Sequence, residues 1–345
     1  MALQILNGAT GYAGAELLAI LNRHPQAQLA HITSESHTGK KISELYPHLR
    51  GLCDLTLESL ADIENIGKDS EFIFIALPHG HAMDVGLKLE NLPVRIIDLG
   101  ADYRFSDTTI YEAWYNVPHK HKNAKRVYGL AEIYRNEIRE AKIIGNAGCF
   151  TTASILALAP LVKHHLIDTN SIIVDAASGV SGAGRGLKLG NHFSELYDNF
   201  KAYNVAHHRH TPEIEQALKD LGGEETIINF TPHLVPMSRG ILATCYATIK
   251  EKISDEMIDA AFQKMYGAEK FIRLLGRNSY PETKFVRGSN FCDLGWHIDE
   301  RTRRVIILSA IDNLVKGAAG QAVQNFNIAA GFYESVALDV VPMYP

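Results

Sequence analysis

A cysteine lies where a helix is expected to begin. Residues 143–160 read Ile-Ile-Gly-Asn-Ala-Gly-Cys-Phe-Thr-Thr-Ala-Ser-Ile-Leu-Ala-Leu-Ala-Pro, and the run from Thr152 to Leu158 is rich enough in Ala and Leu to form a helix. Cys149 therefore lies at a helix N-terminus, where unpaired N–H groups and the dipole favour a thiolate over a thiol. Two interpretations of this stretch stay open: a nucleophile that forms a thioester, or a buried and inert cysteine.

A second cluster of side chains that could take part in a reaction lies at 206–216 and contains three histidines. Thr211-Pro212-Glu213 supplies an N-cap, a proline at the first helical position and an acid in the first turn, so a helix is predicted there. In an extended lead-in His208 and His210 point to the same side. Either can serve as acid and base for a thiol and its adduct, and we prefer His208. A solvated helix entrance is the alternative, and the absence of further ligands at metal spacing predicts no metal site.

A strand, a glycine turn and a helix open the chain, in the order typical of dinucleotide-binding domains. Leu3–Asn7 is the expected strand and Ala15–Leu21 the expected helix. The turn between them has the spacing Gly-x-x-Gly-x-x-Gly, and its backbone N–H groups are expected to receive a pyrophosphate. The candidate cofactor-binding residues of this turn are Gly8, Thr10, Gly11, Tyr12, Ala13 and Gly14.

The loop after the next expected strand, Gln28–Thr33, should contact the cofactor ribose. Glu35 would favour NAD by accepting from a 2′-hydroxyl, whereas Ser34, Ser36 and Lys40 would favour NADP by holding a 2′-phosphate. The residue types conflict, so the choice of cofactor stays open at this point.

Two further apolar runs, 72–77 and 94–99, predict parallel strands buried on both faces, with a helix near 82–89 between them. The first half of the chain is therefore an α/β domain with a doubly wound sheet, expected at 1–148. Polar loops follow these strands, at the edge where such sheets bind ligands. Arg104 in the second loop is a candidate anion clamp, with a surface ion pair as the alternative.

The second half reads as an α+β domain with a largely antiparallel sheet, expected at 149–313, because strand-like runs lie at 172–176, 241–250 and 305–311. The loop at 178–186 holds four glycines and Arg185, and we expect Ser178, Gly179 and Gly182 to approach a phosphate-bearing ligand. A final helix, after Asn313, carries small residues that suit close packing, and 314–345 is expected to return to the first domain.

Composition narrows the class of protein. The chain has 345 residues, 46% of them hydrophobic, and a formal charge of −5, so nothing favours nucleic acid or an anionic membrane as a partner. The four cysteines form no C-x-x-C pair, the first residues do not resemble a signal peptide, and no run is long enough to span a membrane. We therefore expect a cytoplasmic protein without disulfides that acts on a small molecule.

Six segments, spread over nearly the whole chain, resemble the N-acetyl-gamma-glutamyl-phosphate reductase family of arginine biosynthesis. They are Gly8–Gly14, Asn146–Phe150, Ser178–Arg185, His208–Ile214, Thr231–Leu234 and Asn313–Ala322. The resemblance implies an NADP-binding domain followed by a catalytic and dimerisation domain related to aspartate-semialdehyde dehydrogenase. It also implies a homodimer or homotetramer. One departure stands out, since the family usually has Pro where Ala147 lies.

The resemblance also implies roles for single residues. Cys149 would be the nucleophile, and the 208–210 segment would supply the acid/base histidine. Arg104 and Arg185 would lie near the phosphate-bearing substrate or cofactor. Asn146 and Glu213 join them as candidate substrate-binding residues, and Ser178, Gly179, Gly182 and Asn313 join the candidate cofactor site.

The implied reaction is reduction of N-acetyl-glutamyl 5-phosphate to the 5-semialdehyde, through a Cys149 thioester that NADPH reduces. Two other functions stay open. One is a reductase for a carrier-protein-linked aminoadipyl or glutamyl phosphate, for which the basic stretch 119–126 would receive an acidic carrier. The other is a catalytically silent NADP-binding protein.

Overall fold

The computed structural model describes the backbone of residues 2–344 and the side chains of residues 8–344. It divides into two compact units. The first contains the chain up to Ala147 together with Ala318–Val340, and the second contains Gly148–Gly317 with the residues from Val341 onward.

The first unit is built on a seven-stranded sheet with the order β3-β2-β1-β4-β5-β7-β6. All neighbouring strands are parallel. The strands are β1 (Ala2–Asn7), β2 (Ala27–Thr33), β3 (Leu57–Glu58), β4 (Phe72–Ile75), β5 (Arg95–Asp98), β6 (Arg126–Gly129) and β7 (Ile143–Asn146). Every residue of β4 is buried, as expected for a central strand covered on both faces. The predicted doubly wound sheet is confirmed.

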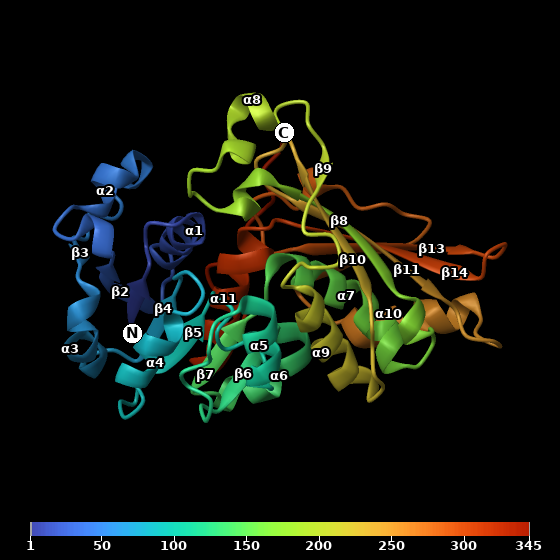
Figure 1. Ribbon diagram of the computed structural model, residues 1–345, viewed down its shortest axis with the longest axis horizontal. Helices are drawn as coiled ribbons and strands as arrows, with labels where there is room; N and C mark the ends of the chain where they lie inside the picture. The colour runs from blue at the N-terminus through green and yellow to red at the C-terminus, as the bar shows by residue number, and fades with distance from the viewer. Residues whose placement is uncertain (1, 345) are drawn as a thin grey trace. The chain divides into compact units, whose positions relative to one another are not determined.

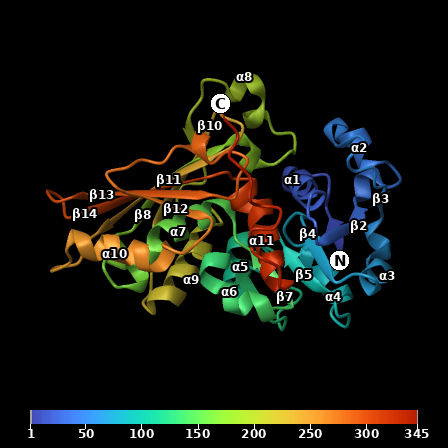
Figure 2. The ribbon, with the colours of Figure 1, turned by 180° about the vertical axis from the view of Figure 1, so that it is seen from behind.

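Seven helices belong to the described part of this unit: α1 (Tyr12–Leu21), α2 (Ile42–Leu45), α3 (Ile63–Lys68), α4 (Ala82–Lys88), α5 (Thr108–Tyr115), α6 (Ala131–Glu140) and α11 (Gly320–Ala329). Although α11 comes almost last in the sequence, it packs on α6, α1 and β7, and all of its residues are buried (Figure 2). Its Phe326 ring lies 4.8 Å from Phe72 and 5.7 Å from Phe74. The core of the first unit therefore depends on a segment from the other end of the chain.

The second unit contains a seven-stranded mixed sheet with the order β12-β13-β14-β11-β8-β10-β9. Two of its pairings are parallel and four antiparallel, so the predicted largely antiparallel sheet is confirmed. The strands are β8 (Ile173–Gly179), β9 (Lys201–Ala202), β10 (Asn229–Val235), β11 (Ile241–Thr248), β12 (Ile272–Arg277), β13 (Cys292–Asp299) and β14 (Arg304–Ile311).

One face of this sheet is covered by helices (Figure 1). They are α7 (Cys149–Lys163), α9 (Thr211–Gly222) and α10 (Asp255–Tyr266), and α7 contacts both β11 and β14. Along β11 buried and half-buried side chains alternate, because alternate residues face the helices. The short helix α8 (Phe193–Leu196) lies in an excursion between β8 and β9, where Leu187, Leu189 and Phe193 are exposed.

The C-terminal residues differ from the expected domain boundary. From Val341 onward the chain groups with the second unit, not with the first. The backbone N–H of Met343 donates to the carbonyl of Arg287 at 2.8 Å, and the Tyr344 ring stacks on Phe285 at 6.1 Å. These contacts hold the tail on the second unit.

Candidate active site

Cys149 is the first residue of α7, so the predicted helix N-terminus is confirmed. Gly148 is its N-cap, in an extended conformation. All four cysteines lie in the described part of the chain, and Cys53, Cys245 and Cys292 are buried whereas Cys149 is half-buried. Burial raises the pKa of the Cys245 thiol, so that cysteine is inert. The helix N-terminus and partial exposure of Cys149 instead fit a reactive thiolate.

The turn into α7 is held by Glu213. This side chain is 0% exposed, and its Oε1 accepts from the Gly148 N–H at 2.9 Å and from the Thr151 hydroxyl at 2.8 Å. Because Gly148 donates to Glu213, the N–H groups left at the start of α7 for a substrate oxyanion begin with Cys149 itself. Glu213 thus contacts the backbone that carries the nucleophile.

His208 and His210 lie beside one another, with ring centroids 4.7 Å apart. Both rings pack edge-on against Phe150, the residue after Cys149, at 5.6 and 6.0 Å. The lead-in is a turn and not the expected extended segment, because the Thr211 N–H donates to the His208 carbonyl at 3.0 Å. The helix α9 also begins at Thr211, with His210 as N-cap, one residue earlier than we predicted.

The two histidines differ in chemistry. Burial, assisted by the charge of Arg209, lowers the pKa of His208 to about 4. The His208 Nδ1 accepts from the His210 N–H at 3.1 Å, so the neutral ring carries its proton on Nε2. His208 is therefore a neutral hydrogen-bond donor across the physiological pH range.

Aromatic side chains that the motifs did not single out surround this pair. Phe230 lies 5.3 Å from His208 and 5.5 Å from Phe150, and Tyr203 lies 5.6 Å from His208. Burial, followed by the charge of a Cys149 thiolate, raises the pKa of Tyr203. Tyr203 thus keeps its proton. Of these aromatic residues, Phe230 could have been predicted as buried from the alternating pattern of β10, and no sequence signal indicated Tyr203.

The glycine-rich loop after β8 is ordered by backbone contacts. The Gly179 N–H donates to the Gly240 carbonyl at 2.9 Å. Asn313, which is 2% exposed, accepts from the Gly240 N–H at 2.8 Å and donates to the Ser181 hydroxyl at 2.9 Å. Its amide thus fixes the loop that we predicted to bind cofactor. Within this loop Ser178 is buried, whereas Gly182 and Arg185 are exposed.

In the first unit, the glycine turn precedes α1 as predicted. Gly8 has a φ of +87°, and a Cβ there would overlap the Ala76 backbone, so both its conformation and its contacts require glycine. A Cβ on Gly14 would lie 2.5 Å from the Gly8 carbonyl oxygen. Gly11 instead caps α1 and faces open space, with nothing within 4 Å of a built Cβ. Tyr12 and Ala13 form the first turn of α1. The turn therefore leaves a helix N-terminus open for a pyrophosphate.

The loop after β2 contains the residues that could contact the cofactor ribose, and they differ in their contacts. The Glu35 carboxylate accepts from the Leu60 N–H at 2.6 Å, so it is bound to the next loop. Ser36 and Lys40 are exposed, and the buried Ser34 has its hydroxyl 3.5 Å from that of Thr10, beside the glycine turn. Glu35 is exposed as well, but one of its carboxylate oxygens is already engaged by the Leu60 N–H.

Arg104 and Asn146 are buried in the first unit, with 7% and 1% exposure. The Arg104 Nε donates to the Asn146 carbonyl at 2.8 Å, and its Nη2 donates to the Leu99 carbonyl at 3.0 Å. The Asn146 amide donates to the Ala318 carbonyl at 3.1 Å and accepts from Asn325 at 2.9 Å. These bonds tie together the ends of β5 and β7.

The neighbouring Ala147 also makes a bond that a proline could not. Its N–H donates to the Gly129 carbonyl at 3.3 Å, which continues the pairing of β6 with β7. A backbone hydrogen bond therefore restrains the turn at the position where the family usually has a proline ring.

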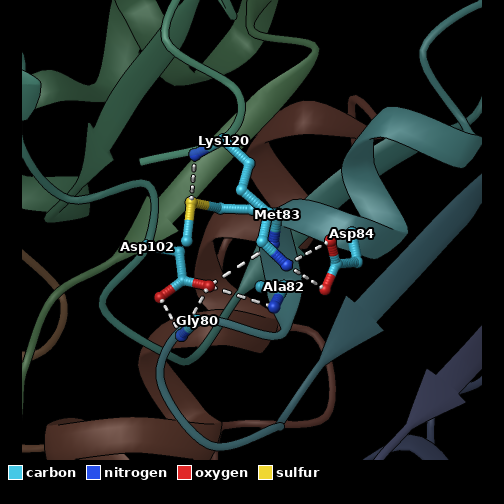
Figure 3. A network of polar contacts seen from close by, with 6 residues as sticks. All are labelled: Gly80, Ala82, Met83, Asp84, Asp102 and Lys120. Atoms are coloured by element: carbon cyan, nitrogen blue, oxygen red, sulfur yellow. Dashed lines mark hydrogen bonds and ion pairs between the residues drawn. The ribbon is translucent and has the colours of Figure 1, made fainter. Parts of the chain in front are cut away.

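Two of the four lysine and arginine side chains in the basic stretch 119–126 pair with carboxylates, and Figure 3 shows the pair that Lys120 makes. Lys120 pairs with Asp84 at 2.7 Å, and Lys122 pairs with Glu112 at 2.8 Å. His119 and His121 are buried, with exposures of 2% and 5%. These two ion pairs offset part of the positive charge of the stretch.

Asp102 anchors the loop that faces this stretch (Figure 3). Its carboxylate accepts from the N–H groups of Gly80 and Ala82, at 2.9 and 3.0 Å, and from the Tyr111 hydroxyl at 2.7 Å. A carboxylate at the N-terminus of α4 is favoured by the helix dipole. The residues near 80 and 102 are thus part of one rigid network at the ends of β4 and β5.

Within residues 8–344, no three His, Cys, Asp or Glu side chains are arranged to hold a metal ion. No helix in the described part of the chain is long and apolar enough to cross a membrane.

Comparison with known proteins decides the family. The semialdehyde dehydrogenase NAD binding domain matches residues 5–141, and the semialdehyde dehydrogenase dimerisation domain matches residues 149–313. The N-acetyl-gamma-glutamyl-phosphate reductase of Pelotomaculum thermopropionicum is 53% identical over 340 residues, which cover 98% of each chain. That of Desulforamulus reducens is 52% identical over 342 residues and 98% of each chain.

The chain belongs to the N-acetyl-gamma-glutamyl-phosphate reductase family. Solved structures of aspartate semialdehyde dehydrogenases share the fold of this reductase family member. The enzyme II of Vibrio cholerae has a TM-score of 0.70 at 17% identity, over 96% of this chain and 99% of that one. The Candida albicans enzyme, solved with NADP, has a TM-score of 0.71 at 15% identity, over 96% and 99%. The predicted resemblance is confirmed.

Proposed function

We propose that this chain reduces N-acetyl-glutamyl 5-phosphate to N-acetyl-glutamate 5-semialdehyde and phosphate, with NADPH as reductant. It would act in arginine biosynthesis, in the cytoplasm, as a homodimer or homotetramer. One observation carries the chemistry: a half-buried cysteine begins α7, and Phe150, the next residue, packs against the rings of His208 and His210. The family membership supplies the substrate class.

The first half of the reaction uses Cys149. Its thiolate attacks the acyl-phosphate carbonyl, and the carbon–oxygen bond to phosphate then breaks. Phosphate leaves, and the acyl group stays on Sγ as a thioester. The N–H groups at the start of α7 stabilise the oxygen of the tetrahedral adduct, because they point out of the helix end. Arg185, exposed on the glycine-rich loop, is our choice for a contact with the phosphate group.

When bound in the first unit, NADPH would supply the hydride that reduces the thioester on Cys149 to a thiohemiacetal. The oxygen of this adduct then re-forms the carbonyl, and the Cys149 thiolate leaves as the aldehyde is released. A histidine acts on that oxygen as general acid and then as general base, by donating a proton and later accepting it again. We assign proton transfer to His210 and a fixed hydrogen bond to His208, the reverse of our first preference, because the low pKa of His208 disfavours its charged form.

NADP is the cofactor that fits the first unit. The open N-terminus of α1 at Gly11 suits a pyrophosphate, and Ser36 and Lys40 suit a 2′-phosphate. Glu35, which would favour NAD, is bound to Leu60. We further propose that Arg104, Asn146 and Glu213 position backbone at the site and do not touch substrate, because each is buried and bonded to main-chain atoms.

The decisive assay runs the reaction in reverse. We expect NADPH to form from NADP when N-acetyl-glutamate 5-semialdehyde and phosphate are both present, and Cys149→Ser to lower this rate at least about 10³-fold with little change in NADP affinity. The aminoadipate analogue, free and carrier-linked, is assayed beside it. A preference for the carrier-linked analogue would establish the carrier-dependent reductase, which the paired lysines of 119–126 disfavour. NADP binding without any turnover would establish the silent binding protein.

The roles of the two histidines are tested by pH–rate profiles. His210→Asn should lower kcat by about 10²-fold or more and remove a limb of the profile, whereas His208→Asn should lower kcat and keep both limbs. If His208→Asn removes the limb instead, the assignment is reversed. If neither variant changes the rate, the segment has no part in proton transfer.

A further inference from the structure

The segment between β14 and α11 forms a π-helical turn, Val315–Ala319. Its widened ring is closed by the Gly317 N–H, which donates to the Asp312 carbonyl at 2.9 Å. Such single π-turns are energetically poor and tend to occur where function requires them. This one is fixed to the end of β14 and is therefore not a frayed helix end.

Asp312 provides that attachment. It is 0% exposed, and its Oδ1 accepts from the N–H groups of Leu314 and Val315 at 2.8 and 3.1 Å. Its Oδ2 accepts from the Gly288 N–H at 2.7 Å. The start of the π-turn thus has a defined position relative to β14 and to the loop before β13.

Gly317 brings this turn against the nucleophile. A Cβ built on Gly317 would lie 2.8 Å from the Cβ of Cys149, 3.1 Å from its Cα and 3.3 Å from Cδ1 of Ile311. Gly317 is not among the glycines with positive φ, so its backbone suits any residue. What the site requires at 317 is the missing side chain, which lets two backbones approach closely.

The nucleophile is thereby held from two directions. Glu213 bonds to the N–H of Gly148 and to Thr151, within the first turn of α7. The backbone of Gly317 lies so close to Cys149 that the space between them would not hold a methyl group. Glu213 fixes the helix end, whereas Gly317 restricts the direction in which Cβ, and hence Sγ, can move.

We infer that Gly317, presented by the π-turn, is a positioning residue for the Cys149 thiolate. This inference rests on the proposed function only where catalysis is the readout. Reacting atoms must lie within a few tenths of an ångström of their productive geometry, and a misplacement of 1 Å can cost about 10²-fold in rate. A methyl group at 317 must move Cys149 and the π-turn apart, because Cβ atoms do not approach to 2.8 Å.

The test compares Gly317→Ala with Gly190→Ala. At Gly190, also in the second unit, a built Cβ meets only the flexible end of Lys201, at 3.2 Å. We expect Gly317→Ala to lower kcat about 10- to 100-fold with unchanged KM for NADP, and to shift the rate and the pH midpoint of Cys149 alkylation by iodoacetamide. Gly190→Ala should match the native chain in each measurement.

A double-variant cycle keeps the inference testable if Gly317→Ala folds poorly. Cys149→Gly removes the Cβ that the new methyl group would meet. Gly317→Ala should then lower Tm by several °C in the native background and by much less in the Cys149→Gly background. Equal losses in both backgrounds, or native alkylation and kcat in Gly317→Ala, would overturn the inference. Alkylation and Tm need no substrate, so they decide the matter even if the proposed reaction is absent.

Discussion

Two pairs of candidate site residues, one pair in each unit, place their side chains in contrasting ways. In the first unit, Arg104 and Asn146 are buried and bonded to main-chain carbonyls at the ends of β5 and β7. In the second, Cys149 and His210 are half-buried, and the His210 ring packs against Phe150. The contrast teaches that a charged or amide side chain at the end of a strand can serve the scaffold, whereas the two residues that we propose to react are not fully buried.

The largest expected effect concerns Arg104. Arg104→Leu should lower the free energy of unfolding by about 2–4 kcal/mol, because the buried Asn146 carbonyl loses its donor. Arg185→Leu, on an exposed loop, should change stability by less than about 0.5 kcal/mol and should instead raise KM for the acyl phosphate. Urea denaturation and steady-state kinetics of both variants measure the contrast. A stable Arg104→Leu protein with a raised KM would remove the distinction between the two arginines.

A second effect concerns Asp98, at the end of β5. Burial, then the charge of Asp102, raises its pKa from 3.8 to about 7. The folded state therefore binds this proton more tightly than the unfolded chain, so the stabilisation is fully present below pH about 4 and is lost as pH rises through 7. Asp98→Asn should remove that loss, so its stability relative to the native chain should rise by about 2–3 kcal/mol between pH 5 and pH 8.

Thermal melts from pH 5 to 8 test this, with Asp107→Asn as control. Asp107 caps α5 by accepting from the Thr109 side chain and backbone, which lowers its pKa. Its contribution is lost only in acid, as pH falls through that lowered value, so the control should show no difference in slope between pH 6 and 8. Parallel curves for Asp98→Asn and the native chain would show that Asp98 is already ionised without penalty.

The smallest effect concerns the basic stretch. Lys120→Ala breaks an exposed ion pair with Asp84, and such pairs contribute less than about 1 kcal/mol. We expect a small fall in Tm and unchanged kcat/KM for the free acyl phosphate. A selective loss of activity toward a carrier-linked substrate would instead assign this surface to carrier binding.

Local signals predicted much of the fold. The glycine turn before α1 and the helix start at Cys149 depend on residues that are neighbours in sequence, so composition and spacing were enough to find them. The excursion with α8 and the π-turn at Val315–Ala319 were not predicted. The π-turn exists because Asp312, Gly288 and Cys149 meet there, and these contacts join segments far apart in the chain.

The sequence singled out candidate site residues, but it did not predict their contacts. His208 and His210 do lie together, but a turn brings them there, and burial separates their chemistry. Glu213 was predicted to bind substrate, and that stays a prediction; the sequence did not indicate the bonds of its carboxylate to Gly148 and Thr151. A sequence reports which side chains can carry charge, while burial and long-range partners decide whether that charge is offered to a ligand.

The late position of α11 has a consequence for synthesis. Residues 318–340 complete the core of the first unit, but the ribosome releases them only after the whole of 148–317 has been made. Until then the parallel sheet lacks the helix that covers Phe72 and Phe74. The N-terminal part of the nascent chain therefore stays incompletely folded, and accessible to chaperones and proteases, until the later half has been synthesised. A premature stop close before residue 320 should consequently leave the first unit without the helix that closes its core, although that unit begins at the other end of the chain.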